Sequence, residues 1–175
     1  MFEKFDTDLR QYSESFMENE IGKCYNLVVL RLVNCNLELF APSKLSSKLQ
    51  VLSLQDNKVK DLNRVRFVNT AAQSLRVAES HYTLQCDLLE LNLSQNKLTE
   101  FPFKALEFCY SLRQLDLSRN QISHLPPEKS WYPKMSNLQE IDLSSNRLSH
   151  FPTDLCHCQS LQELRLIHNE IKEIT

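Results

Sequence analysis

Aliphatic residues recur along the chain in one eleven-residue pattern, Leu-x-x-Leu-x-Leu-x-x-Asn-x-Leu, with Ile or Val at some of the leucine positions. The pattern occupies residues 49–59, 88–98, 112–122, 138–148 and 161–171, and a further copy at 27–37 has Cys35 in place of the asparagine. In the middle of each copy apolar and polar residues alternate, which predicts a short strand with one buried face. Self-similarity of this kind predicts stacked repeats that share a continuous core.

An asparagine follows each predicted strand, at Asn57, Asn96, Asn120, Asn146 and Asn169. A carboxamide both donates and accepts hydrogen bonds, so a buried one can satisfy backbone groups of neighbouring turns. We therefore expect these side chains to form a ladder along the stack.

Apolar residues spaced by three precede several copies of the pattern, and they predict short helical turns that pack onto the core. Cys24, Cys109 and Cys158 hold the same place in three of these turns. Their shared position predicts small buried side chains with free thiols, not a metal or redox set.

The six copies resemble the leucine-rich-repeat family, and the resemblance extends from Leu27 to Thr175. It implies an α/β solenoid in which a curved parallel sheet lines the concave face and helical or irregular turns form the convex face. It also implies a module without catalytic activity that binds proteins on its concave face.

The first 26 residues lie outside the repeats and are expected to form an N-terminal cap. The spacing of Phe2, Phe5, Leu9, Tyr12 and Phe16 places them on one side of an amphipathic helix that runs from Phe2 to about Ile21. Such a helix would shield the open end of the solenoid.

The repeats are expected to fill residues 27–175, with an irregular stretch at 63–87. That stretch can be a helical insertion or a degenerate repeat, and the sequence leaves both open. The chain stops within the sixth repeat, where Leu164, Leu166 and Ile171 have no following repeat to cover them, so we expect a fragment truncated at its C-terminus.

Composition argues against several functional classes. The net charge is -2, with Lys and Arg dispersed along the chain, which does not favour nucleic acid as a partner. There is no signal-like segment and no run of the ~20 apolar residues that a membrane span needs. The six cysteines are then expected to be reduced, which favours the cytoplasm.

The chain also lacks the motifs of an enzyme or a metal site. Its one glycine, Gly22, is too few for a phosphate-binding loop. Cys156, His157 and Cys158 do not supply the four ligands of a structural zinc site. We expect no catalytic, cofactor-binding or metal-binding residues.

The predicted function is a protein-protein interaction module, a scaffold or recognition domain in signal transduction. Carboxylates gather at the outward strand positions of the later repeats, so the partner is expected to carry a basic patch. The candidate partner-binding residues are Glu90, Asn92, Gln114, Asp116, Glu140, Asp142, Glu163 and Arg165. The oligomeric state stays open.

An alternative comes from the turn LPPEKSW and the following LQEIDLSSN, at 125–131 and 138–146. This stretch is similar to the repeat region of animal Roco proteins, the leucine-rich-repeat kinases. That resemblance implies a multidomain parent with a GTPase and a serine-threonine kinase domain outside this chain.

Overall fold

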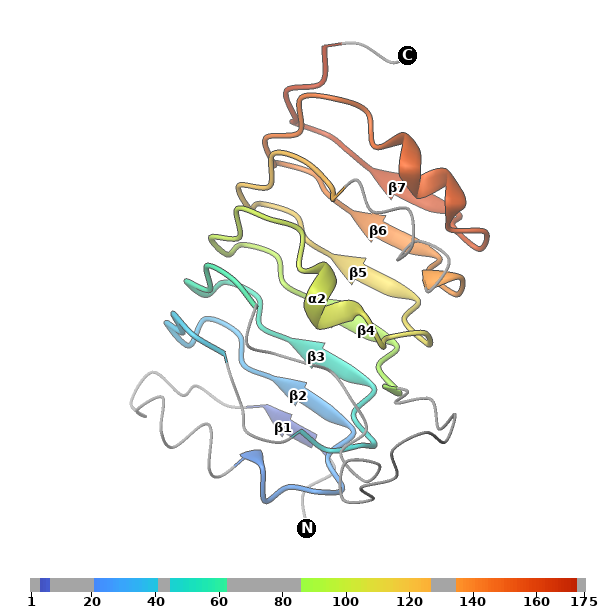
Figure 1. Ribbon diagram of the computed structural model, residues 1–175. Helices are drawn as coiled ribbons and strands as arrows, with labels where there is room; N and C mark the ends of the chain where they lie inside the picture. The colour runs from blue at the N-terminus through green and yellow to red at the C-terminus, as the bar shows by residue number, and fades with distance from the viewer. Residues whose placement is uncertain (1–3, 7–20, 41–44, 63–85, 127–134, 173–175) are drawn as a thin grey trace.

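The computed structural model describes residues 4–6, 21–40, 45–62, 86–126 and 135–172. Within them, seven short strands form one parallel sheet in chain order (Figure 1). The strands are β1 (Lys4–Asp6), β2 (Val29–Arg31), β3 (Val51–Ser53), β4 (Glu90–Asn92), β5 (Gln114–Asp116), β6 (Glu140–Asp142) and β7 (Glu163–Arg165). The predicted parallel sheet is confirmed, and β2 to β7 each come from one copy of the sequence pattern.

The register keeps one apolar position aligned across the sheet. The aligned central residues are Leu30, Leu52, Leu91, Leu115, Ile141 and Leu164. The first five are at most 2% exposed, and Leu164 is partly buried. A slip of one residue would turn these side chains to the other face, so the leucine pattern itself fixes the register.

Little helix occurs in the described part of the chain. A four-residue helix, α2 (Phe103–Leu106), and a five-residue 3-10 helix (Thr153–His157) lie between strands. Ala105 and Leu106 of α2 are buried in the core cluster. Cys109 and Cys158 are also buried, as predicted, whereas Cys24 is only partly buried.

The predicted N-terminal helix is wrong over Lys4–Asp6, which form β1 and pair with β2. The triplet Lys-Phe-Asp has the polar–apolar–polar alternation of the repeat strands, and pairing there satisfies backbone groups along the edge of β2. The rest of the predicted helix, residues 7–20, lies outside the described residues.

The irregular stretch at 63–87 falls almost entirely outside the described residues as well. Its two neighbours, β3 and β4, pair directly, with Leu52 opposite Leu91. The choice between an insertion and a degenerate repeat stays a prediction.

The asparagine ladder is present as expected. Asn120 accepts a hydrogen bond from the Leu98 N–H at 3.0 Å and donates to the carbonyls of Leu93 at 2.9 Å and Leu117 at 3.0 Å. Leu93 and Leu98 belong to the preceding repeat, so one side chain joins two turns. The same contacts recur at Asn57, Asn96, Asn146 and Asn169.

The residue before each ladder asparagine adopts a left-handed backbone conformation. Its φ is 56° at Asp56, 55° at Gln95, 56° at Arg119, 56° at Ser145 and 58° at His168. This bend directs backbone N–H groups towards the next repeat, as where the Arg119 N–H donates to the Ser144 carbonyl at 2.8 Å. None of these residues is glycine, so each carries a conformational cost of about 1–2 kcal/mol.

Replacing Asn120 with alanine should lower the free energy of unfolding by about 2–4 kcal/mol, because it leaves buried backbone groups of two repeats without partners. Urea unfolding followed by circular dichroism measures the change. Asn137→Ala is the matched control, since that exposed side chain makes a single hydrogen bond to the Tyr110 carbonyl. Equal losses from the two variants would contradict the ladder's role.

Replacing Arg119 with asparagine should raise the free energy of unfolding by about 0.5–1 kcal/mol, because asparagine tolerates a positive φ better than arginine. Arg119 is exposed, so its side chain contributes little packing. Arg113→Asn, at an exposed position outside the left-handed set, should change stability by less than about 0.5 kcal/mol. If Arg119→Asn were no more stable than the parent, the bend would not be strained.

Candidate functional site

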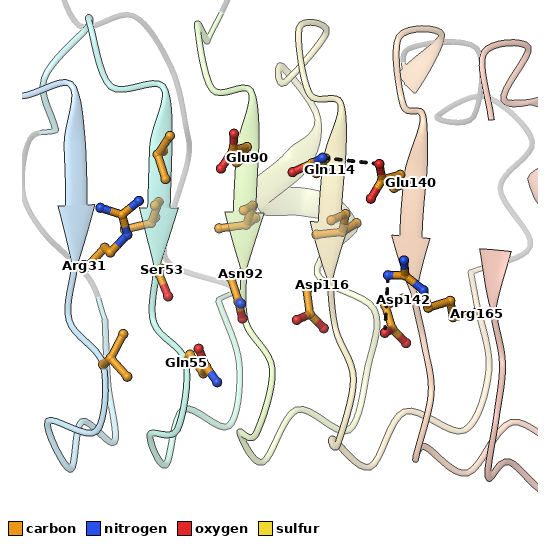
Figure 2. Close-up of a pocket in the computed structure, with 15 residues that line it drawn as sticks. Arg31, Ser53, Gln55, Glu90, Asn92, Gln114, Asp116, Glu140, Asp142 and Arg165 are labelled. Atoms are coloured by element: carbon orange, nitrogen blue, oxygen red, sulfur yellow. Dashed lines mark hydrogen bonds and ion pairs between the residues drawn. The ribbon is translucent and has the colours of Figure 1, made fainter. Parts of the chain in front are cut away.

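The open sheet face is the surface formed by side chains that flank the buried central residues of β2 to β7. It lies on the side of the sheet opposite α2, and Figure 2 shows its polar side chains standing out from successive strands. A shallow hollow of about 360 Å³ runs over it, from Arg31 on β2 to Arg165 on β7. Because neighbouring strands lie about 4.8 Å apart, this face presents side chains in regular columns.

The structure brings seven of the eight predicted partner-binding residues together around this hollow. They are Glu90, Asn92, Gln114, Asp116, Glu140, Asp142 and Arg165. The eighth, Glu163, lies on β7 beside Arg165 but does not line the hollow.

The list of predicted residues omitted part of the hollow. Arg31, Val33, Ser53 and Gln55 also line it, from the earlier repeats. Arg31 and Ser53 occupy the same strand position as Asn92 and Asp116, so the column itself could have identified them.

Carboxylates dominate the charge of this face. Arg165 lies 2.6 Å from a Glu163 oxygen and 3.9 Å from an Asp142 oxygen, which offsets charge at the β7 end. In the middle, the Gln114 side chain donates to the Glu140 carboxylate at 3.3 Å (Figure 2). Among the described residues no cation pairs with Glu90, Asp116 or Glu140, so the centre of the face is acidic.

One column of the face, the inner column formed by Asn92, Asp116 and Asp142, also supports the backbone. The side-chain oxygens of Asn92, Asp116 and Asp142 accept the N–H of the residue two positions later, at 2.9, 2.9 and 2.8 Å. This contact shapes the exit from each strand. Asn92 makes the same bond as the two aspartates, so the bond needs the oxygen and not the charge.

The β2 and β3 end of the face is less charged. Val33 is 38% exposed at the rim of the hollow, and Val51 is partly buried beside it. The face therefore combines a small apolar area with an acidic centre.

Residues that could support chemistry are scarce in the described part of the chain. No group of three or more His, Cys, Asp or Glu side chains there could hold a metal ion. Cys158 is buried, and this burial, followed by the nearby Cys156, raises the pKa of its thiol to about 11, so it is not an activated nucleophile. None of the described helices is both long and apolar enough to cross a membrane.

Comparison with known proteins finds a similar repeat in the second half of the chain. The leucine-rich-repeat family profile matches residues 87–132 and 128–171. No curated protein sequence matches the chain.

Two solved structures are similar over most of the chain. A leucine-rich-repeat protein of Leptospira interrogans aligns with a TM-score of 0.59 and 27% identity, over 87% of this chain and 34% of that one. An internalin of Listeria monocytogenes aligns with a TM-score of 0.66 and 21% identity, over 88% of this chain and 38% of that one. This chain therefore spans little more than a third of either structure, and the second likeness concerns the fold alone.

Substitutions of Asp116 separate the two roles of the inner column, which are to carry negative charge and to bond the backbone at the strand exit. Asp116→Asn should leave the free energy of unfolding nearly unchanged, because it keeps the oxygen that accepts the Ser118 N–H, whereas Asp116→Ala should lower it by about 1 kcal/mol. Thermal unfolding of the two variants measures the difference. Indistinguishable variants would show that the side chain does not shape the strand exit.

Proposed function

We propose that this chain, a leucine-rich-repeat protein, binds a protein partner on its open sheet face, which corresponds to the concave face of the solenoid. Leucine-rich repeats are typically protein-protein interaction modules without catalytic activity. The observation that carries the proposal is the acidic centre formed by Glu90, Asp116 and Glu140 on a single sheet. The partner is proposed to present a basic patch to this centre.

A fixed surface supports tight binding. The strands that carry these carboxylates are paired on both sides along the sheet, and the inner column is held by bonds to the backbone. Little conformational freedom of the backbone is then lost on association, which leaves more of the interaction energy for affinity.

The charge and the apolar area of the open sheet face would contribute differently to partner binding. Acidic side chains attract a basic partner and raise its association rate, and they discourage acidic competitors. Val33 and Val51 at the other end offer apolar contact, which contributes affinity when it is shielded from water.

A second proposal concerns a larger protein. The stretches at 125–131 and 138–146, similar to Roco repeats, support a role as the repeat segment of a multidomain signalling enzyme. In that protein the open sheet face would recruit a substrate or regulator. A transcript that encodes no GTPase or kinase domain with this segment would remove the second proposal and leave the first.

The cytoplasm is the proposed location. None of the six cysteines forms a disulfide in the structure, a state that reducing compartments maintain.

The test reverses charge on the open sheet face. In Glu90→Lys/Glu140→Lys, binding of a partner isolated from the source cells should weaken at least about tenfold, mostly through slower association. The dependence of the association rate on salt should also become smaller. Neither side chain bonds to the backbone, so folding should be retained, as checked by thermal unfolding.

The matched control is Glu100→Lys/Glu170→Lys, which makes the same change of charge at exposed positions outside the strands. It should bind the partner as the parent does. A partner that bound the Glu90/Glu140 variant as tightly as the parent at low salt would contradict the proposed face.

A further inference from the structure

Two cysteines from neighbouring repeats meet at the turns that precede β4 and β5. Their side chains lie close enough to influence each other's ionisation. The backbones are also joined there, because the Cys86 N–H donates to the Phe108 carbonyl at 3.1 Å. Cys86 and Cys109 are thus adjacent in space although 23 positions separate them in the sequence.

The two thiols have different environments. Cys109 is 1% exposed, whereas Cys86 is only partly buried. The Leu88 N–H donates to the Cys86 sulfur at 3.4 Å, and the Cys109 thiol, which lies 4.0 Å from the Ala105 carbonyl, is close to the same sulfur. The Cys86 sulfur therefore has one backbone N–H donor and a neighbouring thiol.

These contacts decide which sulfur ionises. The interaction with Cys109 lowers the pKa of the Cys86 thiol, against the opposing effect of burial. The same interaction, together with burial, raises the pKa of the Cys109 thiol well above its usual range. Of the two thiols, Cys86 is therefore the more readily ionised.

The spacing of adjacent turns suits a covalent bond. Neighbouring strands of a sheet lie about 4.8 Å apart. Disulfides join residues whose Cα atoms are about 4.4–6.8 Å apart, a range that suits two turns joined by a backbone hydrogen bond next to the cysteines, as between the Cys86 N–H and the Phe108 carbonyl.

We infer that Cys86 and Cys109 form a redox modification site that a hydroperoxide converts into a disulfide between the repeats of β4 and β5. The Cys86 thiolate attacks one peroxide oxygen, the O–O bond breaks, and Cys86 becomes a sulfenic acid while the released hydroxide takes up a proton. The Cys109 sulfur then attacks the Cys86 sulfur. The S–O bond breaks, and the departing hydroxide leaves as water with the Cys109 proton. Two thiols and one peroxide thus give one disulfide and two waters.

The bond would tie together the turns that lead into Glu90–Asn92 and Gln114–Asp116. These strands carry part of the open sheet face, so oxidation would stiffen the support of that face without changing its side chains. A cross-link that closes a loop of this length should raise the midpoint of thermal unfolding by roughly 5–10 °C.

The experiment treats the reduced, folded chain with limiting hydrogen peroxide, blocks remaining thiols and digests it with trypsin without reduction. Cleavage after Lys and Arg puts Cys86 in peptide 77–97 and Cys109 in peptide 105–113, while Cys156 and Cys158 share peptide 148–165. We expect the first two peptides to appear as one cross-linked species that dithiothreitol separates.

Three variants make the outcome specific. Cys156→Ser removes an exposed thiol and should leave the cross-link and the thermal shift unchanged. Cys86→Ser should abolish both and leave Cys109 reduced at the same dose. In Cys109→Ala, dimedone should trap the sulfenic acid on Cys86, which the parent resolves. Oxidation of Cys156 while peptides 77–97 and 105–113 stay separate would overturn the inference, as would a cross-link that forms only in the unfolded chain.

Discussion

Every turn of this structure depends on its neighbours to satisfy buried backbone groups. Strands of three residues cannot do so alone, since each carries few hydrogen bonds and a short apolar stretch. The ladder asparagines supply the missing partners, because each carboxamide donates to carbonyls of its own turn and of the preceding one and accepts an N–H of the preceding turn. A buried polar side chain is normally costly, and here it is repaid by several hydrogen bonds at once.

This constraint explains why the two faces of the sheet differ. The central leucine of each strand must point inward to share the core, so its two neighbours must point outward. The outward positions are then free to vary, and here they hold Glu90, Asp116 and Glu140. These positions cannot vary without limit, because Asp116 and Asp142 also bond to the backbone at the strand exit. A substitution can remove charge from the inner column without loss of stability only if the new side chain keeps an oxygen that accepts the backbone N–H.

Much of the fold follows from the sequence because its determinants are periodic. The leucine pattern predicts β2 to β7, their parallel order and the outward columns, and the asparagine position predicts the ladder. Features without a period were not predictable. Lys4–Asp6 pair with β2 through a triplet too short to distinguish from a helical pattern, and the ion pairs of Arg165 depend on side-chain geometry. Cys86 lies outside the cysteine positions that repeat, so nothing in the spacing links it to Cys109.

Labelling of carboxylates with a carbodiimide and an amine tests most directly whether partners bind the acidic open sheet face. Modification of each exposed Glu and Asp would be compared by mass spectrometry for the free chain and for its complex with the partner. Reduced modification of Glu90 and Glu140 is expected in the complex, with Glu100 and Glu170 unchanged. Reduced modification of Glu100 or Glu170, with Glu90 and Glu140 still fully reactive, would contradict it.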